Sequence, residues 1–156
     1  MKTVIVEGIP DAALMKVFGF TTKQIIKEGS KGNVCNRLEK STQMLGMVDE
    51  DPTSAGQPKY LKSLTLTDER YEIKTYFDSQ RQNKLIVLCP NLEEWLLNVV
   101  RKEKVELDKL FGLPTSAQKL HKVINHEIPK FEKLINSLIE KNTTSIVYLK
   151  NSVLAD

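Results

Sequence analysis

Cysteine is scarce in this chain of 156 residues, which contains only Cys35 and Cys89. The two lie far apart, and neither belongs to a Cys-x-x-Cys pair, so a zinc ribbon and a thioredoxin-type motif are excluded. Two unpaired thiols fit a reducing compartment, and we therefore expect a cytoplasmic protein.

Long hydrophobic runs are also lacking. No segment reaches the roughly 18 consecutive apolar residues of a membrane-spanning helix. The apolar run near the N-terminus stops at Glu7 and is too short to be the core of a signal peptide. The sequence therefore predicts neither a membrane partner nor export from the cell.

Neither sign of charge dominates, because 23 basic residues face 20 acidic ones and the net charge is +3. This balance permits nucleic-acid binding without arguing for it, so any such argument must come from where the charges lie. Hydrophobic residues make up 40% and charged residues 28%, as in an ordinary soluble globular protein. A chain of this length can bury a core without disulfides, and we expect a single domain over residues 1–156.

What the sequence does contain is an alternation of strand and helix patterns in residues 1–51. The expected elements are, in order, a strand at 3–6, a helix at 11–18, a strand at 24–27, a helix at 33–42 and a strand at 44–48. Asp11 is placed to cap the first helix, and a role as a ligand is compatible with that position. Because strands that alternate with helices form parallel sheets, this rhythm predicts one.

The pattern changes from strands to helices near residue 90. The expected elements are strands at 71–77 and 85–88 and helices starting at Asn91, at 116–125 and at 130–141, whereas 144–154 fits a helix or a strand. The predicted fold class is therefore α/β, with a Rossmann-like, mainly parallel central sheet flanked by helices. Its core spans about 1–90, and a C-terminal helical cap spans about 91–156.

Acidic residues stand at the ends of two predicted strands. Glu7 ends the first strand and Asp49 the third, and Asp51 points the same way as Asp49 if the chain stays extended there. Functional groups of parallel sheets gather at the carboxyl ends of the strands, where three carboxylates would repel one another unless a cation lay between them. Oxygen ligands of this kind suit Mg²⁺, or Mn²⁺, so the sequence predicts a metal site for phosphoryl chemistry.

Three segments carry a resemblance to a known family. The segments Val4–Asp11 (VIVEGIPD), Gly29–Val34 (GSKGNV) and Gly46–Asp51 (GMVDED) resemble the Toprim domain of topoisomerases, bacterial primases and overcoming-lysogenization-defect nucleases. The family signature is a glutamate after the first strand and an Asp-x-Asp after the third. The resemblance implies that Glu7 acts as general acid or base and that Asp49 and Asp51 bind magnesium.

A fourth segment, Pro90–Leu96 (PNLEEWL), resembles small stand-alone Toprim-like proteins, among them proteins of bacterial defence. This resemblance implies that Glu93 is a fourth acidic residue of the metal site. A structural explanation stands beside it, because acids in the first turn of a helix are stabilised by the helix dipole. The chain departs from the larger members, since it has no topoisomerase tyrosine context, primase zinc module or nuclease ATPase domain.

The remaining polar motifs are less specific. The loop containing Lys31 is not a Walker A loop, but its amides and Lys31 are placed to meet a phosphate, which makes Lys31 a catalytic candidate; a tight structural turn is the alternative. His121 and His126 are expected on the surface, since they lie on different faces of any helix. Trp95 has helical spacing with apolar neighbours and is expected in the core.

Three functions follow from these residues. The first is a magnesium-dependent nuclease, or related phosphoryl-transfer protein, acting on nucleic acid. The second is a non-catalytic binding or regulatory module of the same fold, which needs a protein partner or a second copy of itself for any chemistry. The third is phosphoryl transfer on a nucleotide or another small phosphate. The charge on the surface around the edge that holds Glu7 and Asp49 distinguishes these three functions.

Overall fold

One six-stranded sheet organises the computed structural model, which describes residues 2–155. The strands are β1 (Val4–Val6), β2 (Ile25–Lys27), β3 (Leu45–Asp49), β4 (Thr65–Arg70), β5 (Ile73–Asp78) and β6 (Asn83–Leu88). Their order across the sheet is β2-β1-β3-β6-β5-β4. Strands β2, β1, β3 and β6 pair in parallel, and β5 and β4 add antiparallel strands at one edge. The predicted α/β class with a mainly parallel sheet is confirmed.

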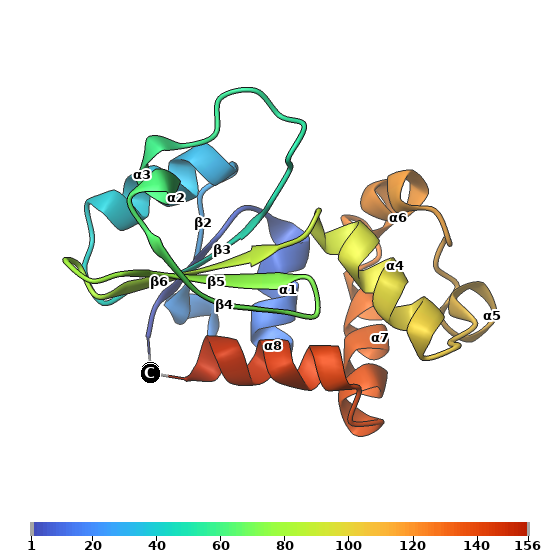
Figure 1. Ribbon diagram of the computed structural model, residues 1–156. Coiled ribbons are helices and arrows are strands. Elements are labelled where there is room, and N and C mark those ends of the chain that lie inside the picture. The colour runs from blue at the N-terminus through green and yellow to red at the C-terminus, as the bar shows by residue number, and fades with distance from the viewer. Residues whose placement is uncertain (1, 156) are drawn as a thin grey trace.

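Helices cover both faces of this sheet. They are α1 (Ile9–Val17), the 3₁₀ turn η1 (Thr22–Gln24), α2 (Lys31–Glu39), α3 (Lys59–Lys62), α4 (Leu92–Lys102), α5 (Leu107–Phe111), α6 (Ala117–Ile124), α7 (Ile128–Glu140) and α8 (Thr144–Leu154). In Figure 1, α2 and α3 lie on one face, α1, α7 and α8 lie on the other, and α4 to α6 extend beyond one end of the strands. Within residues 2–155, no helix has the length and apolar character needed to cross a membrane.

The central strands are buried on both faces, which explains their uninterrupted apolar sequence. Val4 and Val6 pack into the core beneath α1 and α7, whereas Ile5 packs into the smaller core beneath α2. On the α2 side, Gly46 of β3 permits a close approach, because a Cβ there would lie 2.7 Å from Cδ1 of Leu38. The two helical layers are therefore fixed against the same strands.

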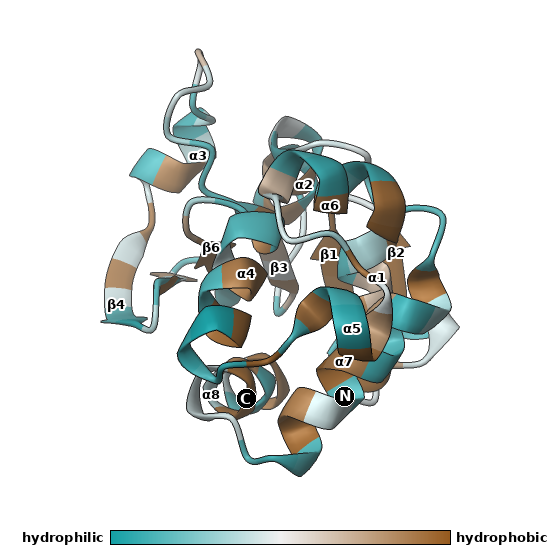
Figure 2. Ribbon diagram, turned by 90° about the vertical axis from the view of Figure 1, so that its right-hand side faces the viewer, coloured by the Kyte–Doolittle hydropathy of each residue, from teal (hydrophilic) through white to brown (hydrophobic). Residues whose placement is uncertain are grey.

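The C-terminal half packs as amphipathic helices, and Figure 2 shows hydrophilic and hydrophobic residues alternating along α4, α6 and α7. The Asn91 side chain caps α4 by accepting a hydrogen bond from the Glu94 N–H at 2.9 Å, as predicted. Trp95 is 1% exposed, which confirms its place in the core, and its indole N–H donates to the Tyr71 carbonyl.

Several element boundaries differ from the sequence predictions. Helix α1 begins two residues before Asp11, because Pro10 is tolerated in a first helical turn. The strand expected from residue 71 begins at Ile73, because Tyr71 and Glu72 have positive φ angles of 55° and 56° and form the turn between β4 and β5. Strand β4 and helix α5 were not predicted, and the ambiguous tail is helix α8.

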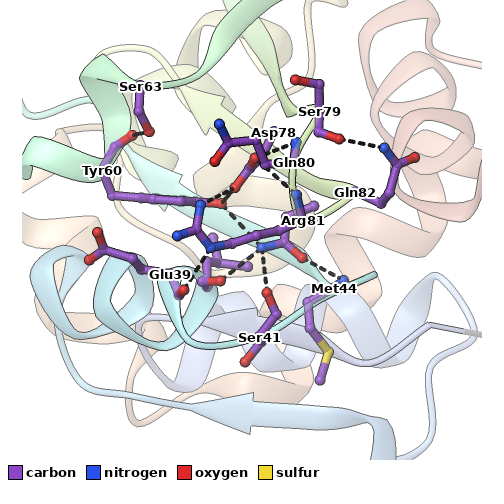
Figure 3. Close-up of polar contacts among 12 residues, drawn as sticks. Glu39, Ser41, Met44, Tyr60, Ser63, Asp78, Ser79, Gln80, Arg81 and Gln82 are labelled. Atoms are coloured by element: carbon purple, nitrogen blue, oxygen red, sulfur yellow. Dashed lines mark hydrogen bonds and ion pairs between the residues drawn. The ribbon is translucent and has the colours of Figure 1, made fainter.

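A polar network ties α3 to the turn between β5 and β6 (Figure 3). The Tyr60 hydroxyl donates to Oδ2 of Asp78 at 2.8 Å, and Nδ2 of Asn83 donates to the Tyr60 hydroxyl at 3.2 Å. Burial acts to raise the pKa of Asp78, but hydrogen bonds from Tyr60 and Arg81 outweigh it and lower that pKa. The segment 50–58 therefore runs from β3, which is fixed in the sheet, to α3, which this network fixes.

Candidate functional site

The parallel pairing of β1 with β3 places Glu7 and Asp49 at the same edge of the sheet. The Asp49 backbone N–H donates to Oε2 of Glu7 at 3.2 Å, so the expected juxtaposition is present. Burial raises the pKa of Glu7, the hydrogen bond from Asp49 opposes this, and the charge of Asp51 adds to the rise. The Glu7 and Asp49 carboxyl groups are therefore close enough for the charge of one to affect the pKa of the other.

Asp11 also belongs to this group of interacting carboxyls. It is the third residue of α1 rather than the residue before it, and its Oδ2 accepts a hydrogen bond from the Gly8 N–H at 3.0 Å. Its side chain is buried beside the edge of the sheet. Burial, followed by the negative charge of Glu7, raises the pKa of Asp11 to about 7. The predicted capping role becomes a reciprocal bond to Gly8, and the carboxyl gains a second role in the cluster.

Asp49 is the most strongly perturbed carboxyl of the cluster. Its Oδ1 accepts a hydrogen bond from the Leu92 N–H, the first amide of α4, at 3.0 Å. Burial and then the charges of Asp11 and Glu7 raise the pKa of Asp49 to about 8. Such a shift is typical of a carboxyl that is removed from water and lies among other acidic groups.

Asp51 reaches the site by a different backbone path from the one expected. Its φ angle is 43°, in the left-handed region, so the chain is not extended between Asp49 and Asp51. The Asp51 N–H donates to the Pro90 carbonyl at 2.9 Å, which holds this turn against the end of β6. Its side chain nevertheless lines cavities shared with Glu7 and with Asp49. The three predicted carboxyl groups are thus brought together.

Glu93 lies in the first turn of α4 and is buried, although it is charged. Its Oε1 lies 2.8 Å from Nδ1 of His121 on α6. The charge of Glu93 also contributes to the raised pKa of both Asp49 and Glu7. The sequence had suggested Glu93 through a family resemblance, but it treated His121 only as a surface residue, because nothing in one sequence shows that α6 packs on α4.

Lys31 is the first residue of α2, whose N-cap is Ser30. Its Nζ donates to the carbonyl oxygen of Glu50 at 2.6 Å and to the side-chain oxygen of Gln57. Lys31 lines a cavity of about 410 Å³ together with Glu7 and Asp51. The ammonium group therefore lies next to the acidic edge while its hydrogen-bond partners are neutral oxygens of the 50–58 segment.

Two further cavities open on the acidic edge. One of about 240 Å³ is lined by both helices and strands, with the following polar residues: Glu7, Asp11, Asp49, Glu93, His121 and Asn125. The other, of about 420 Å³, includes Asp51 and Lys122. Residues 2–155 contain no set of three or more His, Cys, Asp or Glu side chains already arranged to hold a metal ion. The edge therefore offers carboxylate oxygens and space rather than a closed coordination shell.

Comparisons with known protein families, with curated proteins and with solved structures found no match to this chain.

Proposed function

We propose that this chain is a magnesium-dependent phosphoryl-transfer protein of the Toprim type, with a nuclease-like reaction on nucleic acid. The observation that supports this function is the convergence of Glu7, Asp49 and Asp51 at the carboxyl edge of adjacent parallel strands. A structural role alone does not explain why these partly buried acidic groups gather beside the buried Asp11 and Glu93 at a cost in repulsion.

The donor set fits a hard divalent cation. Mg²⁺ prefers carboxylate oxygens and usually keeps several waters, so it binds through one or two carboxylates completed by substrate phosphate. Asp49 and Asp51 would hold the ion here, as the family resemblance implies, and the open cavities leave room for water and a phosphate group. When bound, the ion would stabilise negative charge on the phosphate.

The protein's own residues then divide the remaining work. Glu7 is placed to accept one proton from a water whose oxygen bonds to phosphorus as the ester P–O bond breaks; the leaving oxygen takes a proton from solvent. Lys31 lines the same cavity as Glu7 and Asp51 and would offer a positive charge to a phosphate oxygen there. Burial keeps the Glu7 carboxyl at a raised pKa, which brings it nearer to the operating pH.

The decisive experiment incubates the purified chain with labelled DNA and RNA, single- and double-stranded, in magnesium, manganese or chelator. We expect metal-dependent cleavage that Asp49→Asn abolishes and that Asp108→Asn, an exposed matched control on α5, leaves unchanged. Glu7→Gln should keep substrate affinity and lower kcat by roughly two to four orders of magnitude. If high metal concentration rescues Glu7→Gln and Asp49→Asn equally, Glu7 is a ligand and its proton-transfer role is wrong.

A second function has one observation in its favour. Because no ready three-residue metal group exists among residues 2–155, the scaffold could act as a binding or regulatory module whose chemistry needs a protein partner or a second copy of the chain. Absence of metal-dependent turnover of DNA, RNA and nucleotides by the wild type would overturn the nuclease proposal and favour this module. Turnover of nucleotides alone would favour small phosphates as substrates.

A further inference from the structure

The contact between His121 and Glu93 joins two helices at the mouth of the acidic site. His121 comes from α6 and Glu93 from the first turn of α4, 28 residues earlier, and Nδ1 of the ring lies 2.8 Å from Oε1. The Glu93 side chain is only 10% exposed, whereas that of His121 is 68% exposed. The Glu93 carboxylate is therefore held within the protein, whereas the His121 imidazole is exposed to solvent.

This pairing determines which ring nitrogen carries hydrogen. A carboxylate can only accept hydrogen bonds, so a neutral His121 donates its Nδ1–H to Glu93 and exposes the lone pair of Nε2. Carboxylate–imidazole pairs of this kind are used in active sites to fix both the ring orientation and the tautomer. The Asn125 side chain also donates to the His121 carbonyl at 2.8 Å, which steadies the end of α6.

His121 also lies at the cavities of the acidic edge. His121 lines the 240 Å³ cavity together with Glu7 and Asp49, and it lines the 420 Å³ cavity together with Asp51. Solvent-exposed ion pairs contribute little to stability, so an exposed histidine bonded to a buried glutamate needs another explanation. A hydrogen-bond acceptor at the rim of a carboxylate-lined cavity fits a water molecule or a hydroxyl group.

We propose that His121 is a water-positioning residue of the site and that Glu93 orients it instead of binding the metal ion. Nε2 accepts one hydrogen of the attacking water, while the other hydrogen passes to Glu7 as the new P–O bond forms. His121 itself takes up no proton in this step. The proposal rests on the proposed phosphoryl-transfer function and extends it by a residue that the sequence placed on the surface.

The kinetic experiment compares His121→Ala, His121→Asn and Glu93→Gln in the full chain. Glu93→Gln keeps the size of the side chain, but its amide can either accept a hydrogen bond from Nδ1 or donate one to it, so the tautomer of His121 is no longer fixed. We expect His121→Ala and Glu93→Gln each to lower kcat by roughly 10- to 100-fold with little change in KM, as for a displaced reacting group. His121→Asn, which retains an acceptor, should recover part of the loss.

Because the two residues act as one unit, the double variant His121→Ala/Glu93→Gln should lose no more than either single variant. The matched controls are His126→Gln, on an exposed residue after α6, and Glu103→Gln, on the exposed C-cap of α4; both should have wild-type kinetics. Wild-type kcat in His121→Ala, beside an inactive Asp49→Asn, would overturn this inference and leave the proposed function standing. An inactive wild type would overturn both.

A second measurement does not depend on activity. The chain has two histidines, so its imidazole nitrogen NMR spectrum is simple, and His126→Gln assigns the His121 signals. At mildly alkaline pH, we expect His121 to have hydrogen on Nδ1 in the wild type and a mixture of the two tautomers in Glu93→Gln. Hydrogen on Nε2 in the wild type would overturn the proposal. So would a loss of the magnesium-induced rise in melting temperature in His121→Ala, because His121 would then be a ligand.

Discussion

Charge repulsion at the carboxyl edge predicts how the stability of the metal-free protein depends on pH. The pKa of Asp49 is raised from 3.8 to about 8 by burial and then by the charges of Asp11 and Glu7. A carboxyl with a raised pKa keeps its proton in the folded state at pH values where the unfolded chain has lost it. The contribution of Asp49 to the free energy of unfolding should therefore be highest below about pH 4 and decrease as the pH rises towards 8.

The size of this effect follows from the same values. At about 1.4 kcal/mol for each pH unit, the rise from 3.8 to about 8 sets a ceiling of about 6 kcal/mol. Burial is the largest cause of that rise, and the repulsive part is shared with Asp11 and Glu7, whose pKa values are also raised. We therefore expect Asp49→Asn to raise the free energy of unfolding by roughly half of this ceiling, about 2–3 kcal/mol at pH 8. The Asn carbonyl oxygen can still accept the hydrogen bond from the Leu92 N–H.

The assay is urea unfolding in chelator at pH values from about 5 to about 9, which span the raised pKa. Asp49→Asn should have a flatter pH profile than the wild type and a higher unfolding free energy at pH 8, with an unchanged m-value. Asp108→Asn, which removes an exposed carboxylate from α5, should follow the wild-type profile. A wild type whose stability is constant or rises between pH 5 and 8 would refute the reasoning, as would an Asn variant less stable at every pH.

Three other outcomes can be measured with the same purified protein. Millimolar magnesium should raise the wild-type melting temperature by mass action, and Asp49→Asn should lose that response, as scanning calorimetry would detect. Tyr60→Phe removes a donor to the buried Asp78 carboxylate and should lower the unfolding free energy by about 1–2 kcal/mol in urea titrations; no change would mean that the network is dispensable. Burial raises the pKa of Cys35 to about 11 and of Cys89 to about 12, so both thiols should react with a colorimetric disulfide reagent far faster in denaturant than in the native protein.

The sequence predicts the parallel core and the acidic edge because both depend on local patterns. Glu7 and Asp49 each end a short apolar run, and parallel strands bring such ends together without further information. The residues 65–70 of β4 escaped prediction because they are mostly polar and exposed, with a register shift between Leu66 and Asp68. Edge strands of this kind lack the apolar alternation that identifies a half-buried strand.

The parts of the site that depend on helix packing could not be predicted. Asp11 looks like an ordinary helix cap in the sequence, and its burial beside Glu7 follows only once α1 docks on the sheet. His121 becomes part of the site because α6 packs against α4, a contact between segments that no spacing in the sequence encodes. Asp51 was placed correctly at the edge for the wrong local reason, since its left-handed backbone replaces the expected extended one.

The hydrogen bond from the first amide of α4 to Asp49 also has a consequence for the order in which the protein is built. During synthesis from the N-terminus, Glu7, Asp49 and Asp51 leave the ribosome well before the Leu92 amide that bonds to Asp49. Until α4 and α6 dock, the carboxylates remain hydrated and repel one another weakly. We expect charge repulsion to slow this docking step, so divalent cations should accelerate it more than the earlier collapse of the parallel strands.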